Sequence, residues 1–311
     1  MNAATTAEVT VIVCAHNPHE GRLVRVLDAL RAQTLPQEKW SLLVVDNAST
    51  PPLSTRKLPW PPNATFIVEP ELGLTAARLA GIAAAPGELI VLIDDDTVPA
   101  PDYLAVALDL MQSQPAVGAA GGRIRGEFET PPPSWMQGFL DVLALRDFGD
   151  RPIHALAPNQ PGPWEPCGAG MVVRSQVARA YAAMVRSDPR RRLDRVGARL
   201  SSCGDTDLAR TATDHNLSLA YEPRLQLTHL IPAGRLRYGY LARITYSIQR
   251  DGWMLLRMRG MQCELNGWRL WLRLAAAPLR TLRPDPRQWG LRIAAAWGQL
   301  QGRSLPLEVT R

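Results

Sequence analysis

Stretches typical of buried strands alternate with stretches typical of helices in the first third of the chain, and this alternation restricts the fold most. Val9–Ala15 and the run "ELIVLI" that ends at Ile93 are rich in β-branched and other apolar residues, as expected of strands covered on both faces. Between such runs, Arg22–Gln33 and Gly73–Ala85 carry apolar residues at helical spacing. Strands that alternate with helices form right-handed β-α-β units. The sequence therefore predicts an α/β fold with a Rossmann-type, mostly parallel sheet flanked by helices.

Acidic residues stand where two of these strands are expected to end. Asp46 closes the apolar run of the second strand, and Asp94, Asp95 and Asp96 follow the fourth. Ligands of open α/β sheets bind beyond the carboxyl ends of the strands. We therefore expect these carboxylates to share one edge of the sheet, although they are far apart in the sequence.

The three consecutive aspartates admit two interpretations. In an extended chain Asp94 and Asp96 point to one side and Asp95 to the other. A pair of carboxylates spaced in this way suits Mg²⁺ or Mn²⁺, which takes one or two protein carboxylates and completes its shell with water and phosphate oxygens. The alternative is a polar strand end in which one aspartate makes a local turn.

The second half of the chain is less regular. Residues 127–166 are rich in proline and predict a long loop. Residues 188–201 are basic and are expected to form an exposed connection. Residues 204–216 fit a helix with acids in its first turn, and residues 217–232 fit a pair of strands.

Charge separates the end of the chain from the rest. Residues 235–311 contain 14 arginines and four acids, whereas residues 1–234 carry a net charge of −4. Within this tail, residues 267–282 place tryptophan and arginine on separate stripes, which indicates either contact with an anionic membrane surface or a helical cap packed on protein. Nucleic acid is not favoured, because no zinc-finger, RNP-like or helix-turn-helix pattern accompanies the charge. We expect a division into residues 1–232 and a basic helical region, 233–311.

Cysteine usage and hydropathy bear on location. The four cysteines lie far apart without a CxxC pair, which argues against a disulfide framework or a zinc site and favours a reducing compartment. The sequence shows neither a signal peptide nor an apolar run long enough to span a membrane. We expect a cytoplasmic protein, with peripheral contact to the inner face of the cell membrane as an option for residues 267–282.

Several motifs in order resemble those of family 2 glycosyltransferases with the GT-A fold. They are "VTVIVCAHN" at the first strand, "LLVVDNAST" at the second, "ELGLTAARLAGI" at a helix start, "LIDDDTVP" as the DxD element, "GDTDL" as the later acidic motif, and "LTHLIP" with its histidine. The resemblance covers roughly residues 8–232. The ordered set is much more specific than any one of its members.

The resemblance implies an inverting transfer of a sugar from a nucleoside-diphosphate donor, with UDP-sugar the commonest, to a hydroxyl acceptor on a glycan or lipid. Such enzymes use Mn²⁺ or Mg²⁺ at the diphosphate and an aspartate as general base, often in surface polysaccharide or glycolipid synthesis. The matching positions are Ala15, Asn17, Asp46, Arg78, Asp94 and Asp95 for the nucleotide; Asp94, Asp96 and His229 for the metal; and Asp205, with Asp207 as second choice, for the base. Outside these motifs, Gly168, Ala169 and Gly170 are candidates for the acceptor region.

The match has departures and each candidate has a simpler reading. The acidic motif commonly begins with Glu, and Gly204 stands in that place. Asp205 could instead cap a helix, and His229 could be an ordinary core histidine. Gly168 and Gly170 could merely form a tight turn before a strand.

Other enzyme classes fit less well. A haloacid-dehalogenase-like phosphatase would explain "DDDTV", but it needs a lysine after the nucleophile, and the lysines here, Lys39 and Lys57, both precede it. The chain lacks the GxGxxG of dinucleotide enzymes after its first strand and the GxxxxGK(S/T) of P-loop proteins. The remaining alternative is a catalytically weak relative that binds a nucleotide sugar as a regulatory or scaffold module, as the Gly204 departure allows.

Overall fold

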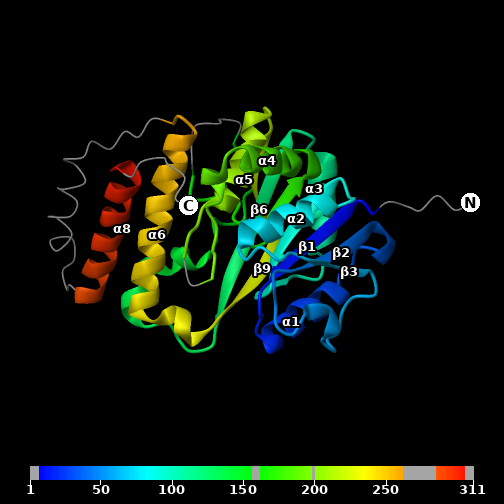
Figure 1. Cartoon of the computed structure of the whole chain (residues 1–311), viewed down its shortest axis with the longest axis horizontal. Coiled ribbons are helices and arrows are strands. Elements are labelled where there is room, and N and C mark those ends of the chain that lie inside the picture. The colour runs from blue at the N-terminus through cyan, green and yellow to red at the C-terminus, as the bar shows by residue number, and fades with distance from the viewer. Residues whose placement is uncertain (1–6, 156–161, 198–199, 262–284, 305–311) are drawn as a thin grey trace, which may run out of the picture.

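A mixed sheet forms the centre of the protein in a computed structural model that describes residues 7–155, 162–197, 200–261 and 285–304 (Figure 1). Its nine strands follow the order β3-β2-β1-β4-β8-β6-β9-β5, with β7 paired to β9. The pairs β3-β2, β2-β1, β1-β4 and β6-β9 are parallel, whereas β8, β5 and β7 pair antiparallel. The strands are β1 (Val9–Ala15), β2 (Trp40–Asp46), β3 (Ala64–Val68), β4 (Leu89–Asp94), β5 (Thr97–Pro99), β6 (Val117–Phe128), β7 (Ile153–Ala155), β8 (Val172–Arg174) and β9 (Ser218–Ile231).

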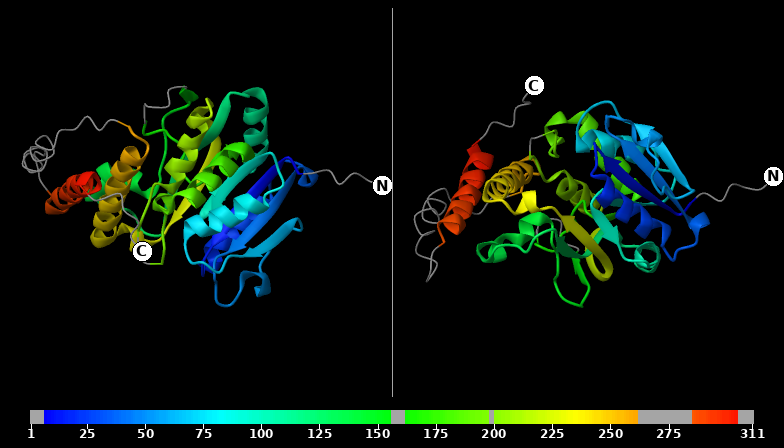
Figure 2. Two further views of the ribbon diagram at one scale, coloured as in Figure 1. Left: turned by 45° about the horizontal axis from the view of Figure 1, so that its top comes forward. Right: turned by 90° about the horizontal axis from the view of Figure 1, so that it is seen from below.

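Helices cover both faces of the sheet, as the alternation of strands and helices predicts. They are α1 (Glu20–Arg31), α2 (Leu74–Ala84), α3 (Tyr103–Ser113), α4 (Ser175–Ser187), α5 (Gly204–Asp214), α6 (Tyr238–Met258) and α8 (Pro286–Ser304), with short 3₁₀ helices that include η3 (Ser134–Leu143), η4 (Pro189–Arg191) and η5 (Ala233–Leu236). Helices α6 and α8 lie side by side at the end of the molecule away from β3 (Figures 1 and 2). Every helix in the described ranges is too short or too polar to cross a membrane.

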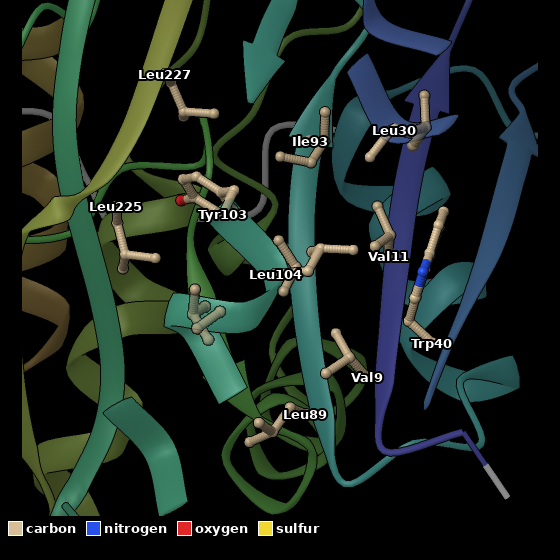
Figure 3. Close-up of a cluster of buried hydrophobic side chains, with 14 of the residues drawn as sticks. Val9, Val11, Leu30, Trp40, Leu89, Ile93, Tyr103, Leu104, Leu225 and Leu227 are labelled. Atoms are coloured by element: carbon tan, nitrogen blue, oxygen red, sulfur yellow. The ribbon is translucent and has the colours of Figure 1, made fainter. Parts of the chain in front are cut away.

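Alternation along the strands divides the apolar side chains between two cores. Val9, Val11 and Val13 of β1 are fully buried on the face covered by α1 and α3. Figure 3 shows part of the hydrophobic cluster on this face. Ile12 points to the opposite face, which α2, α4 and α5 cover. Because successive side chains of a strand point to opposite faces, a strand buried on both sides reads as a continuous apolar run. The apolar run at residues 9–15 therefore predicted its position correctly.

The end of the sheet differs from the expected pair of strands. Residues 218–231 form one strand, β9, rather than two. Its pairing with β6 shifts register, since Gly122 opposes Glu222 while Arg123 opposes Gln226. Pro223 lies in this bulge, where its missing N–H interrupts no ladder bond. The proline therefore marks a bulge within a strand and not a break between two strands.

The basic segment 188–201 was expected to be exposed, and this expectation is wrong for its centre. Leu193 and Asp194 are 5% and 6% exposed. A hydrogen bond from the Leu74 N–H to the Arg195 carbonyl, at 2.9 Å, holds the segment against the start of α2. The many arginines of the segment predicted exposure, but Leu193 and Asp194 among them are buried.

Candidate active site

The strand register brings the predicted rim residues together. Ala15 at the end of β1 lies opposite Asp46 of β2, and Cys14 lies opposite Asp94 of β4. Parallel strands end at the same edge, so the acids that follow them share it. The carboxyl ends of β1 and β4, through Cys14 and Asp94, form one edge of a cleft of about 350 Å³.

The second half of the chain meets this rim through β5. After Asp94 the chain turns and enters β5, which pairs with β9 so that Thr97 lies opposite His229. A hydrogen bond from the Leu230 N–H to the Asp96 carbonyl, at 2.8 Å, fixes the two segments. As a result His229 Nε2 lies 3.6 Å from Asp96 Oδ1. The strand pairing brings together two residues that are 133 positions apart.

Arg235 completes this group from η5. Its Nη2 donates to Asp96 Oδ2 at 2.8 Å, and its Nη1 lies 2.8 Å from His229 Nε2. On the other side of the ring, His229 Nδ1 lies 2.9 Å from the Leu143 carbonyl oxygen. A carbonyl oxygen only accepts, so Nδ1 carries a hydrogen and the neutral ring has its lone pair on Nε2. That lone pair and the Asp96 carboxylate both face the Arg235 guanidinium.

The Asp96 carboxylate and the His229 Nε2 lone pair suit a divalent cation, because both are metal-ligating groups and both face the same point, where the Arg235 guanidinium lies. A carboxylate oxygen and an imidazole lone pair are ordinary metal ligands, and here a positive group already lies between them. Within the described residues, His, Cys, Asp and Glu form no group of three or more that could hold a metal. A cation at Asp96 and His229 would therefore need further ligands from water or substrate phosphate.

The three aspartates titrate in different ways. Burial opposes ionisation of Asp96, but contact with His229 and the charge of Arg235 outweigh it and lower its pKa to about 2. Burial raises the pKa of Asp95 to about 7, and the charges of Asp96 and Asp94 add to this rise. Burial also raises the pKa of Asp94, against the opposing charge of Arg78. Among these three aspartates, Asp96 is therefore firmly ionised, whereas the charge of Asp94 and Asp95 depends on a positive partner.

Arg78 supplies positive charge on the other side of Asp94. It comes from α2, is 5% exposed, and places Nη2 3.9 Å from Asp94 Oδ1. Its Nη1 donates to Asp194 Oδ2 at 3.1 Å. Burial opposes its charge, but Asp194, Asp94 and Asp205 together raise the pKa of Arg78.

The two acids of the "GDTDL" motif have different surroundings. Asp205 is half-buried and lines the cleft, where its carboxylate accepts the Gly168 N–H at 2.7 Å and the Thr206 N–H at 2.8 Å. Asp207 is fully buried and accepts hydrogen bonds from Arg191 at 2.9 Å and from Arg259 at 2.7 Å. Asp207 therefore ties α5 to two other segments, whereas Asp205 faces the cleft.

Gly168 fits tightly between the arginine and the acid. A Cβ added to it would lie 2.2 Å from Arg78 Nη2 and 3.3 Å from Asp205 Cβ. Ala169 also lines the cleft, whereas Gly170 does not and is bonded through its carbonyl to the Tyr103 hydroxyl. A side chain at position 168 would therefore displace the Arg78 guanidinium, so the glycine lets the arginine and the acid approach each other.

The remaining predicted residues lie outside the cleft lining. Both oxygens of Asp46 accept backbone N–H groups, from Ser49 at 2.9 Å and from Leu53 at 2.7 Å, so this buried carboxylate stabilises its own turn. Asn17 is exposed and accepts the Thr50 N–H at 2.8 Å. The cleft gathers Arg78, Asp94, Asp95, Asp96, Gly168, Ala169, Asp205 and His229, and the structure places Ala15, Asn17, Asp46, Gly170 and Asp207 outside its lining.

Two cleft residues escaped sequence reasoning. Arg235 lies six positions after His229, in the part of the chain assigned to the basic tail, and no pattern singled it out among the arginines there. Asp194 lies in the segment expected to be exposed. The one available signal was Gly204, whose missing side chain leaves room that another residue must fill.

Comparison with known proteins agrees with this architecture. The sequence model of "Glycosyl transferase family 2" matches residues 10–173, more than half of the chain. A glycosyltransferase named AglE from Haloferax volcanii is 30% identical over 132 residues, which cover 41% of this chain and 42% of that relative. The chain thus spans about two fifths of the length of this curated relative. With its mostly parallel sheet flanked by helices, of the GT-A type, the chain belongs to glycosyl transferase family 2.

Proposed function

We propose that the chain is an inverting glycosyltransferase that moves a sugar from a nucleoside-diphosphate donor, with UDP-sugar the first choice, to a hydroxyl acceptor. One observation carries this proposal. A single cleft combines the acids of the β4 end, the Asp96–His229–Arg235 group and Arg78 with a separate carboxylate, Asp205. Positive and metal-binding groups suit a departing diphosphate, and a separate carboxylate suits an attacking hydroxyl.

In this proposal the donor lies along the carboxyl ends of β1, β2 and β4. The nucleobase lies over the rim at Ala15, Asn17 and Asp46, where Asp46 holds the shape of the turn. Arg78 then meets the diphosphate from the first turns of α2, since its buried guanidinium already points at Asp94. Asp94 and Asp95 lie between rim and diphosphate.

Asp96 and His229 would hold Mn²⁺ or Mg²⁺, and water or phosphate oxygens would complete the shell. Asp94, the third metal ligand that the resemblance implies, forms no group of three with them among the described residues. Such an ion, when bound, neutralises the negative charge that grows on the departing diphosphate. Arg235 shares both Asp96 and His229, so it would have to turn aside, and its guanidinium would then contribute a second positive charge to the same phosphates.

Asp205 is proposed as the general base. The two N–H groups that donate to its carboxylate hold it in a fixed orientation. Attack by the acceptor hydroxyl on the anomeric carbon breaks the bond to the diphosphate, and the hydroxyl proton passes to Asp205. Gly168 and Ala169 would form the floor under the acceptor, with Gly170 behind them.

The proposed cellular setting rests on the cysteines and on the C-terminal region. Cys14, Cys167 and Cys203 are free thiols, which supports a reducing, cytoplasmic location. We propose residues 1–232 as the catalytic domain and 233–311 as the C-terminal region, although Arg235 and Tyr240 bring that region into the cleft wall. The acceptor would be a glycan or lipid-linked glycan of surface polysaccharide or glycolipid synthesis, and the membrane contact assigned to residues 267–282 lies outside the described residues.

Calorimetric titration with UDP, dTDP and GDP, each with and without Mn²⁺ or Mg²⁺, tests the proposal. We expect metal-dependent binding of one nucleotide by wild type and loss of the metal effect in Asp96→Ala. Release of the nucleoside diphosphate from its sugar conjugate in the presence of an acceptor extract separates an enzyme from a binding module. A wild-type protein that binds none of the three nucleotides contradicts the proposal.

A further inference from the structure

Asp194 is a buried acid of the cleft that the proposed reaction does not use directly. It is 6% exposed, and its Oδ2 accepts from Arg78 Nη1 and from the Thr75 hydroxyl, both at 3.1 Å. Burial raises its pKa, and the charge of Arg78 partly offsets this rise. A buried carboxylate is stable only with such partners, so Asp194 and Arg78 depend on each other.

Gly204 provides the space that this carboxylate occupies. A Cβ added at Gly204 would lie 2.4 Å from Asp194 Oδ2 and 2.6 Å from its Cγ. Gly204 is the first residue of α5, and Thr75 lies in the first turn of α2. Asp194 is therefore at the amino ends of two helices, where a negative charge is favoured.

Without Asp194, Arg78 would keep Asp94 and Asp205 as its nearest acids. Its guanidinium would then be drawn toward Asp94, whose Oδ1 is already 3.9 Å away. A closer Arg78–Asp94 pair would engage the carboxylate at the β4 end and turn the arginine away from a phosphate. Asp194 counters this attraction, because it accepts a hydrogen bond from Nη1, the other terminal nitrogen of the guanidinium.

We propose that Asp194 is a positioning residue that holds Arg78 ready for the donor diphosphate, and that position 204 must be glycine because the Asp194 carboxylate fills that space. The carboxylate that a side chain at 204 could supply comes instead from segment 188–201. This inference rests on the proposed function in assigning Arg78 to the diphosphate, but the pairing of Asp194 with Gly204 is independent of it.

The first test compares a nucleoside with its diphosphate. With the diphosphate that wild type binds, we expect Asp194→Ala to lower affinity roughly 10- to 100-fold, the effect of losing a charge-assisted contact, and the nucleoside to bind unchanged. Asp194→Asn, which keeps the side-chain shape, guards against misfolding and should show the same pattern more weakly. Asp109→Ala is the matched control, because it removes an exposed aspartate paired with Arg224 at 3.3 Å. Equal losses for nucleoside and diphosphate, or no loss, would overturn the positioning role.

The second test moves the carboxylate. In Asp194→Ala/Gly204→Glu the new side chain starts where the old carboxylate lay, so we expect diphosphate affinity to recover at least threefold over Asp194→Ala. Gly204→Glu alone should lose affinity, because two carboxylates would then compete for one space. A double variant no better than Asp194→Ala contradicts the shared position.

Urea unfolding provides a test without nucleotide. Gly204→Ala should lower the unfolding midpoint in the wild-type background and much less in the Asp194→Ala background, because the collision is then gone. Additive effects would overturn the pairing of these residues. If the wild-type protein binds no nucleotide, the proposed function is contradicted. The unfolding midpoints of the single and double variants at positions 194 and 204 then test the pairing of these two residues without it.

Discussion

The end of β4 and segment 188–201 line the same cleft, yet they reach it by different means. Asp94, Asp95 and Asp96 follow an apolar strand, and the sheet alone fixes which way they face. Asp194 lies between arginines outside any helix or strand, and its direction depends on Thr75, Arg78 and the space above Gly204. The first region is determined by local pattern, and the second depends on contacts with Thr75 and Arg78, which are more than a hundred positions away.

This difference shows where charge patterns inform and where they mislead. An acid after a buried strand has few places to point, so its sequence position predicts its location. An acid in a basic loop is predicted to be solvated, because the average polarity of the loop gives no sign of a single buried ion pair such as Asp194 with Arg78. The predictions below test how far the two regions differ in function and in stability.

The largest effect is expected at Asp205, which lines the same cleft as both regions. Asp205→Asn should lower kcat by about 10²–10⁴-fold, the usual contribution of a general base, with nucleotide affinity nearly unchanged. The measurement is steady-state release of the nucleoside diphosphate. Asp207→Asn serves as the control, and it should reduce the free energy of unfolding while the folded protein stays active. Equal kinetic losses in both variants would contradict the assignment of the base.

At the strand end, Asp96→Asn should lower turnover by about 10²–10³-fold, because it removes the carboxylate whose pKa His229 and Arg235 hold low. The Mn²⁺ or Mg²⁺ dependence of nucleotide binding should disappear with it. Asp28→Asn, an exposed acid of α1, is the control. Full metal dependence in Asp96→Asn would show that the strand end does not hold the cation.

In segment 188–201, Arg191→Ala should reduce the free energy of unfolding by about 1–3 kcal/mol, because a fully buried Asp207 loses one of its two arginine partners. Urea unfolding at pH 7 measures this change. Arg190→Ala should have a smaller effect, since that side chain is more exposed and bonds Asp188. A loss at Arg190 that matches the loss at Arg191 would mean that the segment is stabilised at its surface.

The last prediction concerns the chemical reactivity of the Cys14 thiol, which lies opposite Asp94 in the sheet. Burial raises the pKa of this thiol to about 12, with Arg78 acting in the opposite direction, so little thiolate exists at pH 8. Alkylation by iodoacetamide should be about 10³-fold slower than that of a thiol of pKa near 9, and it should speed up about tenfold per pH unit until the pH approaches the pKa. Peptide mass spectrometry with glutathione as reference measures this rate. Modification of Cys14 as fast as glutathione would show that the cleft is wetter than its burial indicates.

The sequence by itself determined the parallel core of the sheet, its two-sided burial and the rim on which Asp94, Asp95 and Asp96 stand, because strand and helix periodicity is local. Motif order also identified Arg78, Asp205 and His229 as residues of one site, and the cleft gathers all three.

Only the tertiary structure decided the rest. The pairing of β5 with β9 brought His229 to Asp96, and η5 added Arg235 to both. Asp205 and Asp207 are two residues apart but have different surroundings. Asp205 lines the cleft, whereas Asp207 is buried against two arginines. Such choices depend on which long-range partner satisfies each buried charge, and no local pattern contains that information.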